Sequence, residues 1–281
     1  MKRPEKVRHR GPRRHLGPPA PSLQSAPMTI MAVNARAPRV ARLGLFFERI
    51  IDGAVMGELV GFNRPDGGLC QGYLVGPANA PGLVLIQEWW GLNDHIKSVA
   101  ERLTAAGYRV LVPDLFRGQV AMEVREAEHL MQGLKFMDTA RQDIRGAVQY
   151  LKASGSAKVG VMGYCMGGAL AVLAAVFVPE SRANCAWYGY APLDYIDPGK
   201  IHAPLQGHFG TQDPVVGSGL EALDAKLKAA GIAHEFYRYD AKHAFANEAA
   251  DAMDVPGLGY NPDAAELAWD RTLAFFKRHL D

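Results

Sequence analysis

The clearest pattern along the chain is an alternation of short apolar runs with longer stretches of helical spacing. Leu83 to Gln87 is an apolar run typical of a buried strand, and helical spacing follows from about Asp94 to Ala106. Further strands are predicted over 68–75, 110–112, 158–162, 186–188, 205–209 and 236–239, and further helices over 121–136, 138–153, 166–176, 218–230 and 262–279. Strands that alternate with helices in this way predict an α/β fold, with a mostly parallel central sheet and helices on both faces. We expect one domain over residues 56–281.

Residues 1–55 differ from this pattern. They carry 11 Lys or Arg and 3 Asp or Glu, a net charge of +8, whereas the rest of the chain has a net charge of −6. The first 27 residues are rich in Arg and Pro and lack the apolar core of a signal peptide, and the prolines argue against the amphipathic helix of a transit peptide. We expect a basic, largely disordered extension, with a short helix possible over 43–55, where apolar residues have helical spacing.

A basic segment of this kind has an alternative interpretation. Clustered Lys and Arg side chains contact phosphate groups, so residues 1–55 could bind nucleic acid or an acidic partner. This hypothesis predicts salt-sensitive binding that is lost when the segment is deleted. We favour an extension without that role, because aromatic residues are not interleaved with its charges, and we expect no nucleic-acid or membrane partner.

The cysteine content favours a reducing compartment. The chain has 3 cysteines, Cys70, Cys165 and Cys185, and this small, odd number argues against a disulfide framework. No segment approaches the roughly 18 uninterrupted apolar residues of a membrane span. We therefore expect a cytoplasmic protein, either a monomer or a small homo-oligomer.

One cysteine lies in a sequence with chemical meaning. Gly163-Tyr164-Cys165-Met166-Gly167 joins a predicted strand to a predicted helix. In α/β-hydrolase folds a turn of this sequence type lifts a nucleophile above the edge of the sheet, usually with Ser in place of Cys. The flanking glycines permit the tight turn, and the N–H of Met166 would face developing negative charge at the helix N-terminus. The alternative is a buried structural Cys at the start of a helix.

Two further residues fit the order that such a nucleophile requires. A thiol nucleophile needs a base to accept its proton and an acid to orient that base. Asp213 follows the predicted strand 205–209, and His243 follows the predicted strand 236–239. Both therefore lie at the carboxyl edge of the sheet, together with Cys165. Alone, each has an ordinary interpretation as a turn or surface residue, but the order Cys, Asp, His favours a catalytic triad.

A carboxylate at the end of the strand 83–87 is a third unusual feature. Glu88 follows Gln87 directly, where this fold supplies the second N–H of an oxyanion hole, here that of Trp89. A carboxylate in that place is costly unless it is paired or functional. The structural alternative is a salt-bridged Glu at a strand end.

Taken together, these residues resemble the dienelactone hydrolases (carboxymethylenebutenolidases). The resemblance covers about Met56 to Asp281. It rests on Gln87-Glu88, Pro113-Asp114-Leu115-Phe116, Gly163 to Gly168, Asp213, His243-Ala244-Phe245-Ala246 and Ala268 to Thr272.

The resemblance implies a role for each candidate residue. Cys165 would be the nucleophile, His243 the base and Asp213 the residue that orients it. Glu88 would hold the resting thiol by a hydrogen bond and assist its activation when substrate displaces it. The backbone N–H groups of Trp89 and Met166 would bind the oxyanion. The family opens small-molecule lactones through an acyl-enzyme and requires no metal or organic cofactor.

The residues expected to bind substrate depart from the pattern of the family. Family members that act on an anionic lactone carry Arg shortly after the Pro-Asp-Leu turn and four residues after the catalytic His. Here Arg117 lies one position early and Asn247 takes the second place. We expect Arg117, Trp90, Tyr188, Phe245 and Asn247 to line the substrate pocket. A general carboxylester or thioester hydrolase without a physiological lactone therefore remains the alternative activity.

Overall fold

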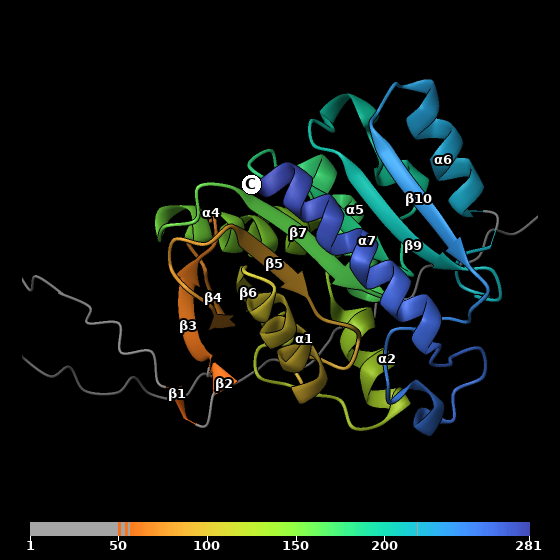
Figure 1. Ribbon diagram of the computed structural model, residues 1–281, viewed down its shortest axis with the longest axis horizontal. Helices are drawn as coiled ribbons and strands as arrows, with labels where there is room; N and C mark the ends of the chain where they lie inside the picture. The colour runs from red at the N-terminus through yellow and green to blue at the C-terminus, as the bar shows by residue number, and fades with distance from the viewer. Residues whose placement is uncertain (1–49, 52–53, 56, 218) are drawn as a thin grey trace, which may run out of the picture. The chain divides into compact units, whose positions relative to one another are not determined.

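The protein is built around an eight-stranded sheet (Figure 1). The computed structural model describes residues 50–51, 54–55, 57–217 and 219–281, all within the compact unit Phe47–Asp281. In spatial order the strands are β10 (His234–Tyr239), β9 (Leu205–Gly210), β8 (Asn184–Trp187), β7 (Val159–Tyr164), β5 (Gly82–Ile86), β6 (Arg109–Pro113), β4 (Leu69–Val75) and β3 (Glu58–Asn63). Neighbouring strands are parallel from β10 to β6, and β4 is antiparallel to both β6 and β3. This confirms the predicted mostly parallel sheet.

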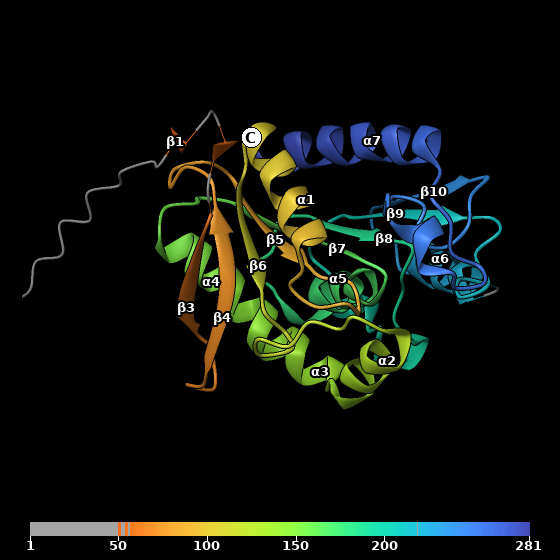
Figure 2. The ribbon, with the colours of Figure 1, turned by 90° about the horizontal axis from the view of Figure 1, so that it is seen from below.

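Helices cover both faces of the sheet (Figure 2). Helices α1 (Asp94–Ala105) and α7 (Pro262–Leu280) pack on one face, and α4 (Arg145–Ala153) and α5 (Met166–Phe177) pack on the other. The remaining elements are α2 (Val124–Gly133), α3 (Phe136–Thr139), α6 (Gly219–Ala229), a π turn η1 (Ala140–Ile144), and the 3₁₀ turns η2 (Leu193–Tyr195), η3 (Pro198–Lys200) and η4 (Ala250–Met253). The sheet therefore has a separate apolar core on each side.

The local sequence explains why these elements form. Every residue of β5, β6 and β7 is buried, because helices cover both faces of these strands. Helix α1 begins at Asn93, whose side chain accepts a hydrogen bond from the Ile96 N–H at 3.1 Å. Helix α7 begins in the same way at Asn261, with Pro262 in its first turn. Helix α5 is apolar around almost its whole circumference, which suits its central position.

The predicted strands and helices of residues 68–281 are all present, with ends within about three residues of the prediction. Strand β3 was not predicted. It lies at the edge of the sheet, most of its residues are exposed, and Gly61 interrupts its apolar alternation. The predicted helix 138–153 is interrupted by η1, and nothing in its spacing indicates this turn.

The prediction of a short helix over 43–55 is wrong for those residues of the segment that the structure describes. The described residues form two antiparallel strands, β1 (Ile50–Ile51) and β2 (Ala54–Val55), with Ile50 opposite Val55. β-branched residues such as Ile50, Ile51 and Val55 favour strands. Residues 1–49 lie outside the described residues, so the basic extension stays a prediction.

None of the helices in the described part of the chain combines the length and the apolar character that crossing a membrane would require.

A buried polar network ties α7 to the sheet behind the predicted site. The Nε2 of His208 is 3.0 Å from Gln206 Oε1 and 2.9 Å from Thr272 Oγ1, and its Nδ1 is 2.8 Å from the Tyr239 hydroxyl. Since the Gln206 oxygen can only accept, Nε2 carries the proton and the imidazole is neutral. Burial, together with the charge of Arg271, lowers the pKa of His208 to about 3.

This network predicts a loss of stability in acid. The pKa of His208 is lower in the folded chain than the ordinary 6.5, so the unfolded chain binds the extra proton between about pH 6.5 and pH 3. The contribution of His208 to stability is therefore complete above pH 6.5 and is lost as the pH falls. Relative to His208→Gln, the wild-type protein should lose about 1 kcal/mol of unfolding free energy between about pH 7.5 and pH 5.5, measured by urea titration. If the unfolding free energies of the two proteins changed with pH by the same amount, the lowered pKa of His208 would be contradicted.

Candidate active site

The predicted nucleophile Cys165 lies in a tight turn between β7 and α5. Its backbone has φ 54° and ψ −117°, a conformation that residues other than Gly rarely adopt. The Cys165 N–H donates to the Trp187 carbonyl at 3.0 Å, which ties the turn to β8. A Cβ on Gly167 would lie 2.5 Å from the Ile86 carbonyl oxygen, and one on Gly168 would lie 2.5 Å from that of Trp187. Only glycines allow this approach, and the turn leaves the Cys165 side chain partly exposed.

The structure brings His243 and Asp213 together at the same edge of the sheet. They lie on the loops that follow β10 and β9, and the His243 Nδ1 is 2.7 Å from the Asp213 Oδ2. Their side chains are 6% and 0% exposed. The Cys165 thiol is near enough to the imidazole to raise the pKa of His243. The three residues, far apart in the sequence, therefore lie at one edge of the sheet, with Asp213 and His243 joined by a hydrogen bond.

Surrounding groups fix the orientation of this pair. The second carboxylate oxygen of Asp213, Oδ1, accepts a hydrogen bond from the Val215 N–H at 2.8 Å. The His243 N–H donates to the Gly257 carbonyl at 3.0 Å, and the edge of the Tyr188 ring packs against the imidazole with 5.2 Å between ring centroids. Asp213 can therefore hold one tautomer of His243, with the proton on Nδ1.

Electrostatics favour a proton on His243. Burial opposes a positive charge and lowers the pKa of the imidazole, but hydrogen bonds with Asp213 and Cys165 outweigh it and raise the pKa from 6.5 to about 10. An imidazole with this pKa is a strong acceptor for the proton of a neighbouring thiol. The arrangement therefore suits a base that activates a sulfur nucleophile.

Glu88 is held by two neutral donors. Its Oε2 accepts a hydrogen bond from the Asn247 side-chain amide at 2.7 Å, and its Oε1 accepts one from the Tyr188 hydroxyl at 3.3 Å. Among the described residues no hydrogen bond joins Glu88 to the Cys165 thiol. The expected contact between Glu88 and the resting thiol is therefore not present in this conformation. Asn247 and Tyr188, expected in the substrate pocket, position the carboxylate.

Two backbone N–H groups are available where an oxyanion would form. The close approach of Gly167 to the Ile86 and Gln87 carbonyls brings the end of β5 beside the first turn of α5. In that turn the N–H of Met166 has no acceptor within its helix. Among the described residues, neither this N–H nor that of Trp89 donates to a protein acceptor. The pair of donors predicted for the oxyanion is therefore unoccupied by protein groups.

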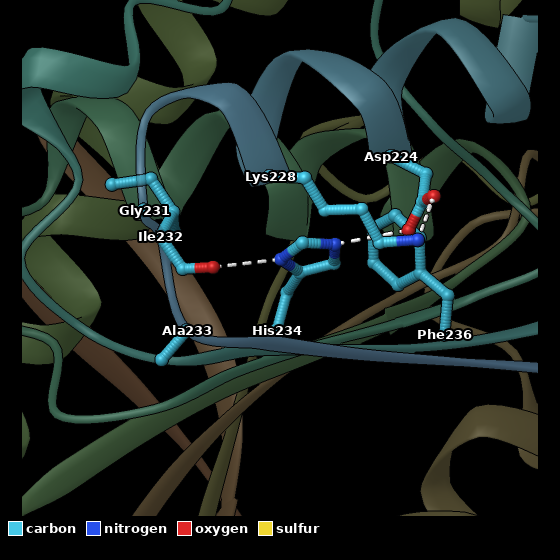
Figure 3. Close-up of a pocket in the computed structure, with 7 residues that line it drawn as sticks. All are labelled: Asp224, Lys228, Gly231, Ile232, Ala233, His234 and Phe236. Carbon is cyan, nitrogen blue, oxygen red and sulfur yellow. Dashed lines mark hydrogen bonds and ion pairs between the residues drawn. The ribbon is translucent and has the colours of Figure 1, made fainter.

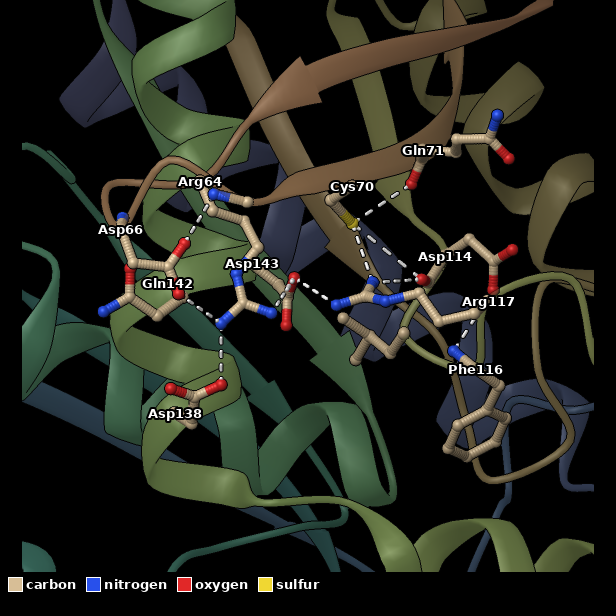
Figure 4. Close-up of polar contacts among 12 residues, drawn as sticks. Arg64, Asp66, Cys70, Gln71, Asp114, Phe116, Arg117, Asp138, Gln142 and Asp143 are labelled. Atoms are coloured by element: carbon tan, nitrogen blue, oxygen red, sulfur yellow. Dashed lines mark hydrogen bonds and ion pairs between the residues drawn. The ribbon is translucent and has the colours of Figure 1, made fainter. Parts of the chain in front are cut away.

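Arg117 makes its polar contacts with residues outside this site, and Figure 4 shows these contacts. Its guanidinium forms an ion pair with Asp143 at 2.6 Å and donates to the Asp114 carbonyl at 2.8 Å, and it lies 3.0 Å from the Cys70 sulfur. All these partners lie outside the predicted site. The positive backbone φ of 55° at Arg117 and the π turn that carries Asp143 direct the two side chains toward each other. The sequence gives no signal for this pairing.

Phe245 is a core residue rather than a pocket residue. Its side chain is fully buried and packs against the rings of Trp187, Tyr188 and Tyr239, with 5.2 to 5.8 Å between centroids. It supports Tyr188, which in turn contacts both His243 and Glu88. A substrate cannot reach Phe245 without displacing this aromatic cluster.

An apolar wall stands beside the predicted oxyanion position. Trp90 is buried and packs edge-to-face on the partly buried Trp89, with 5.3 Å between ring centroids. Met253, Val124 and Leu130 also pack in this cluster. The sequence predicts Trp90 as one of the aromatic residues of an apolar substrate pocket. Met253 was missed, because it comes from η4, far along the chain, and an isolated Met carries no sequence signal.

His234 lies in a pocket outside the Cys165 site. His234 lines a pocket between α6 and β10 (Figure 3), where its Nε2 is 3.0 Å from Asp224 Oδ1 and its Nδ1 is 2.7 Å from the Ile232 carbonyl. Asp224 also forms an ion pair with Lys228 at 2.6 Å. None of the residues that line this pocket is a predicted site residue, so it is separate from the Cys165 site.

Comparison with known proteins shows the family to which the chain belongs. The model of the dienelactone hydrolase family matches residues 70–280. The chain is 32% identical to protein usf of Aquifex pyrophilus over 238 residues, which cover 80% of this chain and 100% of that protein.

Solved structures give the same fold. A dienelactone hydrolase-like promiscuous phosphotriesterase from metagenomic libraries superimposes with a TM-score of 0.71 at 23% identity, over 80% of this chain and 100% of that one. A dienelactone hydrolase from Anabaena variabilis superimposes with a TM-score of 0.58 at 22% identity, over 80% and 99% of the two chains. At such identities the likeness concerns the fold alone, and it confirms the predicted α/β-hydrolase fold.

The exposure of the three cysteines predicts which one reacts. Burial raises the pKa of the Cys70 and Cys185 thiols to about 12 in each case, whereas Cys165 is partly exposed beside His243. Iodoacetamide should therefore alkylate Cys165 well before the other two, as measured by peptide mass spectrometry over time. Alkylation of Cys70 or Cys185 at a similar rate would show that the environment of Cys165 is misassigned.

The contact between Asp213 and His243 predicts a titration. The pKa of His243 is raised, so its imidazole should stay protonated until the pH rises through about 10, as followed by NMR of the ring. In Asp213→Asn the pKa should fall substantially, because burial remains while the strongest stabilising hydrogen bond is weakened. An unchanged His243 titration in the variant would argue against the pairing.

Proposed function

Because the chain belongs to the dienelactone hydrolase family, we propose that it is a cysteine-dependent hydrolase that opens lactones or cleaves small carboxylic esters. The family makes the protein a hydrolase, and the proposal assigns the residues that carry out the reaction. The observation that supports it most strongly is the hydrogen bond between Asp213 and His243 at the carboxyl edge of the sheet, where the partly exposed Cys165 also lies.

Before the first step the proton of the Cys165 thiol has passed to His243, whose raised pKa keeps it there, and the sulfur then attacks the carbonyl carbon of the ester. The carbonyl π electrons move to the oxygen, which becomes a tetrahedral oxyanion. The N–H groups of Trp89 and Met166, free of protein acceptors, stabilise this charge. Asp213 keeps the imidazole oriented and stabilises its positive charge.

In the second step the tetrahedral intermediate collapses. The bond to the alkoxide oxygen breaks, His243 returns its proton to that oxygen, and a thioester to Cys165 remains. Water then attacks the thioester while His243 accepts one of its protons. Release of the carboxylic acid restores the thiol, so the cycle consumes only ester and water. With a lactone, the alkoxide and the acid are two ends of one product.

Glu88 acts in this proposal through its charge. It is almost completely buried, and Tyr188, which donates a hydrogen bond to it, also packs against His243. A negative charge there favours the imidazolium form of His243 during each step. Displacement of its neutral donors by substrate would let the carboxylate approach the thiol, which is the activation that the family resemblance implies.

Substitution of Cys165 tests the proposed nucleophile. Cys165→Ala should lower kcat for a p-nitrophenyl ester by at least about 10³-fold, because only oxyanion binding would remain. Cys165→Ser should also be severely impaired, since a hydroxyl gives up its proton far less readily than a thiol. The rate of p-nitrophenol release provides the measurement.

Cys185→Ala is the matched control for these variants. Cys185 is fully buried on β8, away from the reacting groups, so this variant should keep a near wild-type kcat. Retention of activity in Cys165→Ala would refute the proposed mechanism, as would an equal loss in Cys185→Ala with the fold intact by circular dichroism.

A further inference from the structure

We infer that the site selects uncharged esters with an apolar acyl group and discriminates against esters whose acyl group ends in a carboxylate. The inference rests on the proposed function, because it names the class of substrate that the Cys165 site would take. It follows from two features of the described residues. One is a buried carboxylate that lacks a cationic partner, and the other is the apolar wall at Trp89 and Trp90.

The first feature is the electrostatic environment of Glu88. Both of its oxygens accept hydrogen bonds, which is the pattern of an ionised carboxylate. The donors are the Asn247 amide and the Tyr188 hydroxyl, which are neutral and leave the negative charge uncompensated. The residue is 5% exposed, so solvent screens this charge only weakly.

Cations of the described residues do not offset this charge. No Lys or Arg among them forms an ion pair with Glu88 or with Asp213. Arg117 is committed to Asp143, and Lys242, although it precedes His243, has an exposed side chain. The protonated His243 already pairs with Asp213. A second carboxylate brought by the substrate would therefore face repulsion without a partner to bind it.

The second feature is the apolar surface next to the reacting carbonyl. Trp89 supplies one proposed oxyanion N–H, and its indole packs on Trp90 in the cluster that includes Met253. Trp90 and Met253 also line a cavity of about 840 Å³ together with Leu92 and other apolar residues. This volume exceeds what a medium-length acyl chain occupies. Cys165 and His243 do not line this cavity, so the surface that an acyl group on Cys165 would meet is the Trp89 indole, which packs on Trp90 and is apolar rather than cationic.

Charged residues at the rim of this cavity do not change the conclusion. Lys97 is among its lining residues, but its ammonium is 3.3 Å from the Asp94 carboxylate. Glu123 adds a further negative charge to the lining. A terminal carboxylate on a substrate would therefore find no unpaired Lys or Arg among the described residues that line the cavity.

A pair of esters of equal length tests the inference. p-Nitrophenyl hexanoate and mono-p-nitrophenyl adipate share the leaving group and differ only in a terminal methyl or carboxylate. We expect the wild-type protein to have a kcat/KM for the hexanoate at least about tenfold higher than for the adipate, after subtraction of spontaneous hydrolysis. Turnover of both esters with equal kcat/KM, or with preference for the adipate, would overturn the inference and leave the proposed function intact. Turnover of neither ester would contradict the proposed function and the inference together.

Two variants trace the preference to Glu88. Asn247→Arg places a cation beside the Glu88 carboxylate. It should reduce the ratio of kcat/KM for the hexanoate to kcat/KM for the adipate about tenfold, even if kcat/KM falls for both esters. Glu88→Gln removes the charge with little change in shape and should narrow the ratio in the same direction. Glu248→Gln is the matched control, since it changes the net charge by the same amount as Asn247→Arg at an exposed neighbouring position. If this control narrows the ratio as much as the two site variants, the preference arises from overall charge and the inference fails.

Discussion

The close packing of the turn around Cys165 is the constraint on which the site depends. The backbone of Cys165 is held at φ 54°, and it can stay there because Gly167 and Gly168 let helix α5 touch strands β5 and β8 without a Cβ between them. This contact places Cys165 at the edge of the sheet where β9 and β10 end and the loops that carry Asp213 and His243 begin. It also places the first N–H groups of α5 beside the end of β5. A side chain at either glycine would separate the nucleophile from the donors that its reaction requires.

Burial assigns different tasks to the two carboxylates of the site. Asp213 is fully buried, pairs with His243 and raises the pKa of the imidazole to about 10 together with Cys165, so its charge is used to hold a proton. Glu88 is buried as deeply, but the groups that donate hydrogen bonds to it are neutral. Its negative charge is therefore not compensated and would repel an anionic substrate. The first carboxylate supports the reaction, and we propose that the second one influences which substrates reach it.

The sequence predicts those parts of the molecule that local patterns determine. The strands from β4 to β10, and the order of Cys165, Asp213 and His243 at their carboxyl ends, follow from apolar runs and from the loops after them. Contacts between distant segments leave no such pattern. The pairing of Arg117 with Asp143, and the hold of Asn247 on Glu88, depend on tertiary packing. For the same reason the sequence places Phe245 in the pocket although the structure buries it. The edge strand β3 is missed for a local reason, because most of its residues are exposed and Gly61 interrupts its apolar alternation.

The central claim is that Cys165 becomes covalently acylated during turnover. The most direct measurement is mass spectrometry of the protein after acid quenching in the first turnovers with p-nitrophenyl hexanoate. The account predicts an added hexanoyl group, located after digestion on the peptide that contains Cys165, removed by neutral hydroxylamine as a thioester is, and absent in Cys165→Ala. Catalytic turnover with no acyl group on Cys165 at any quench time, or with the acyl group on another residue, would contradict it.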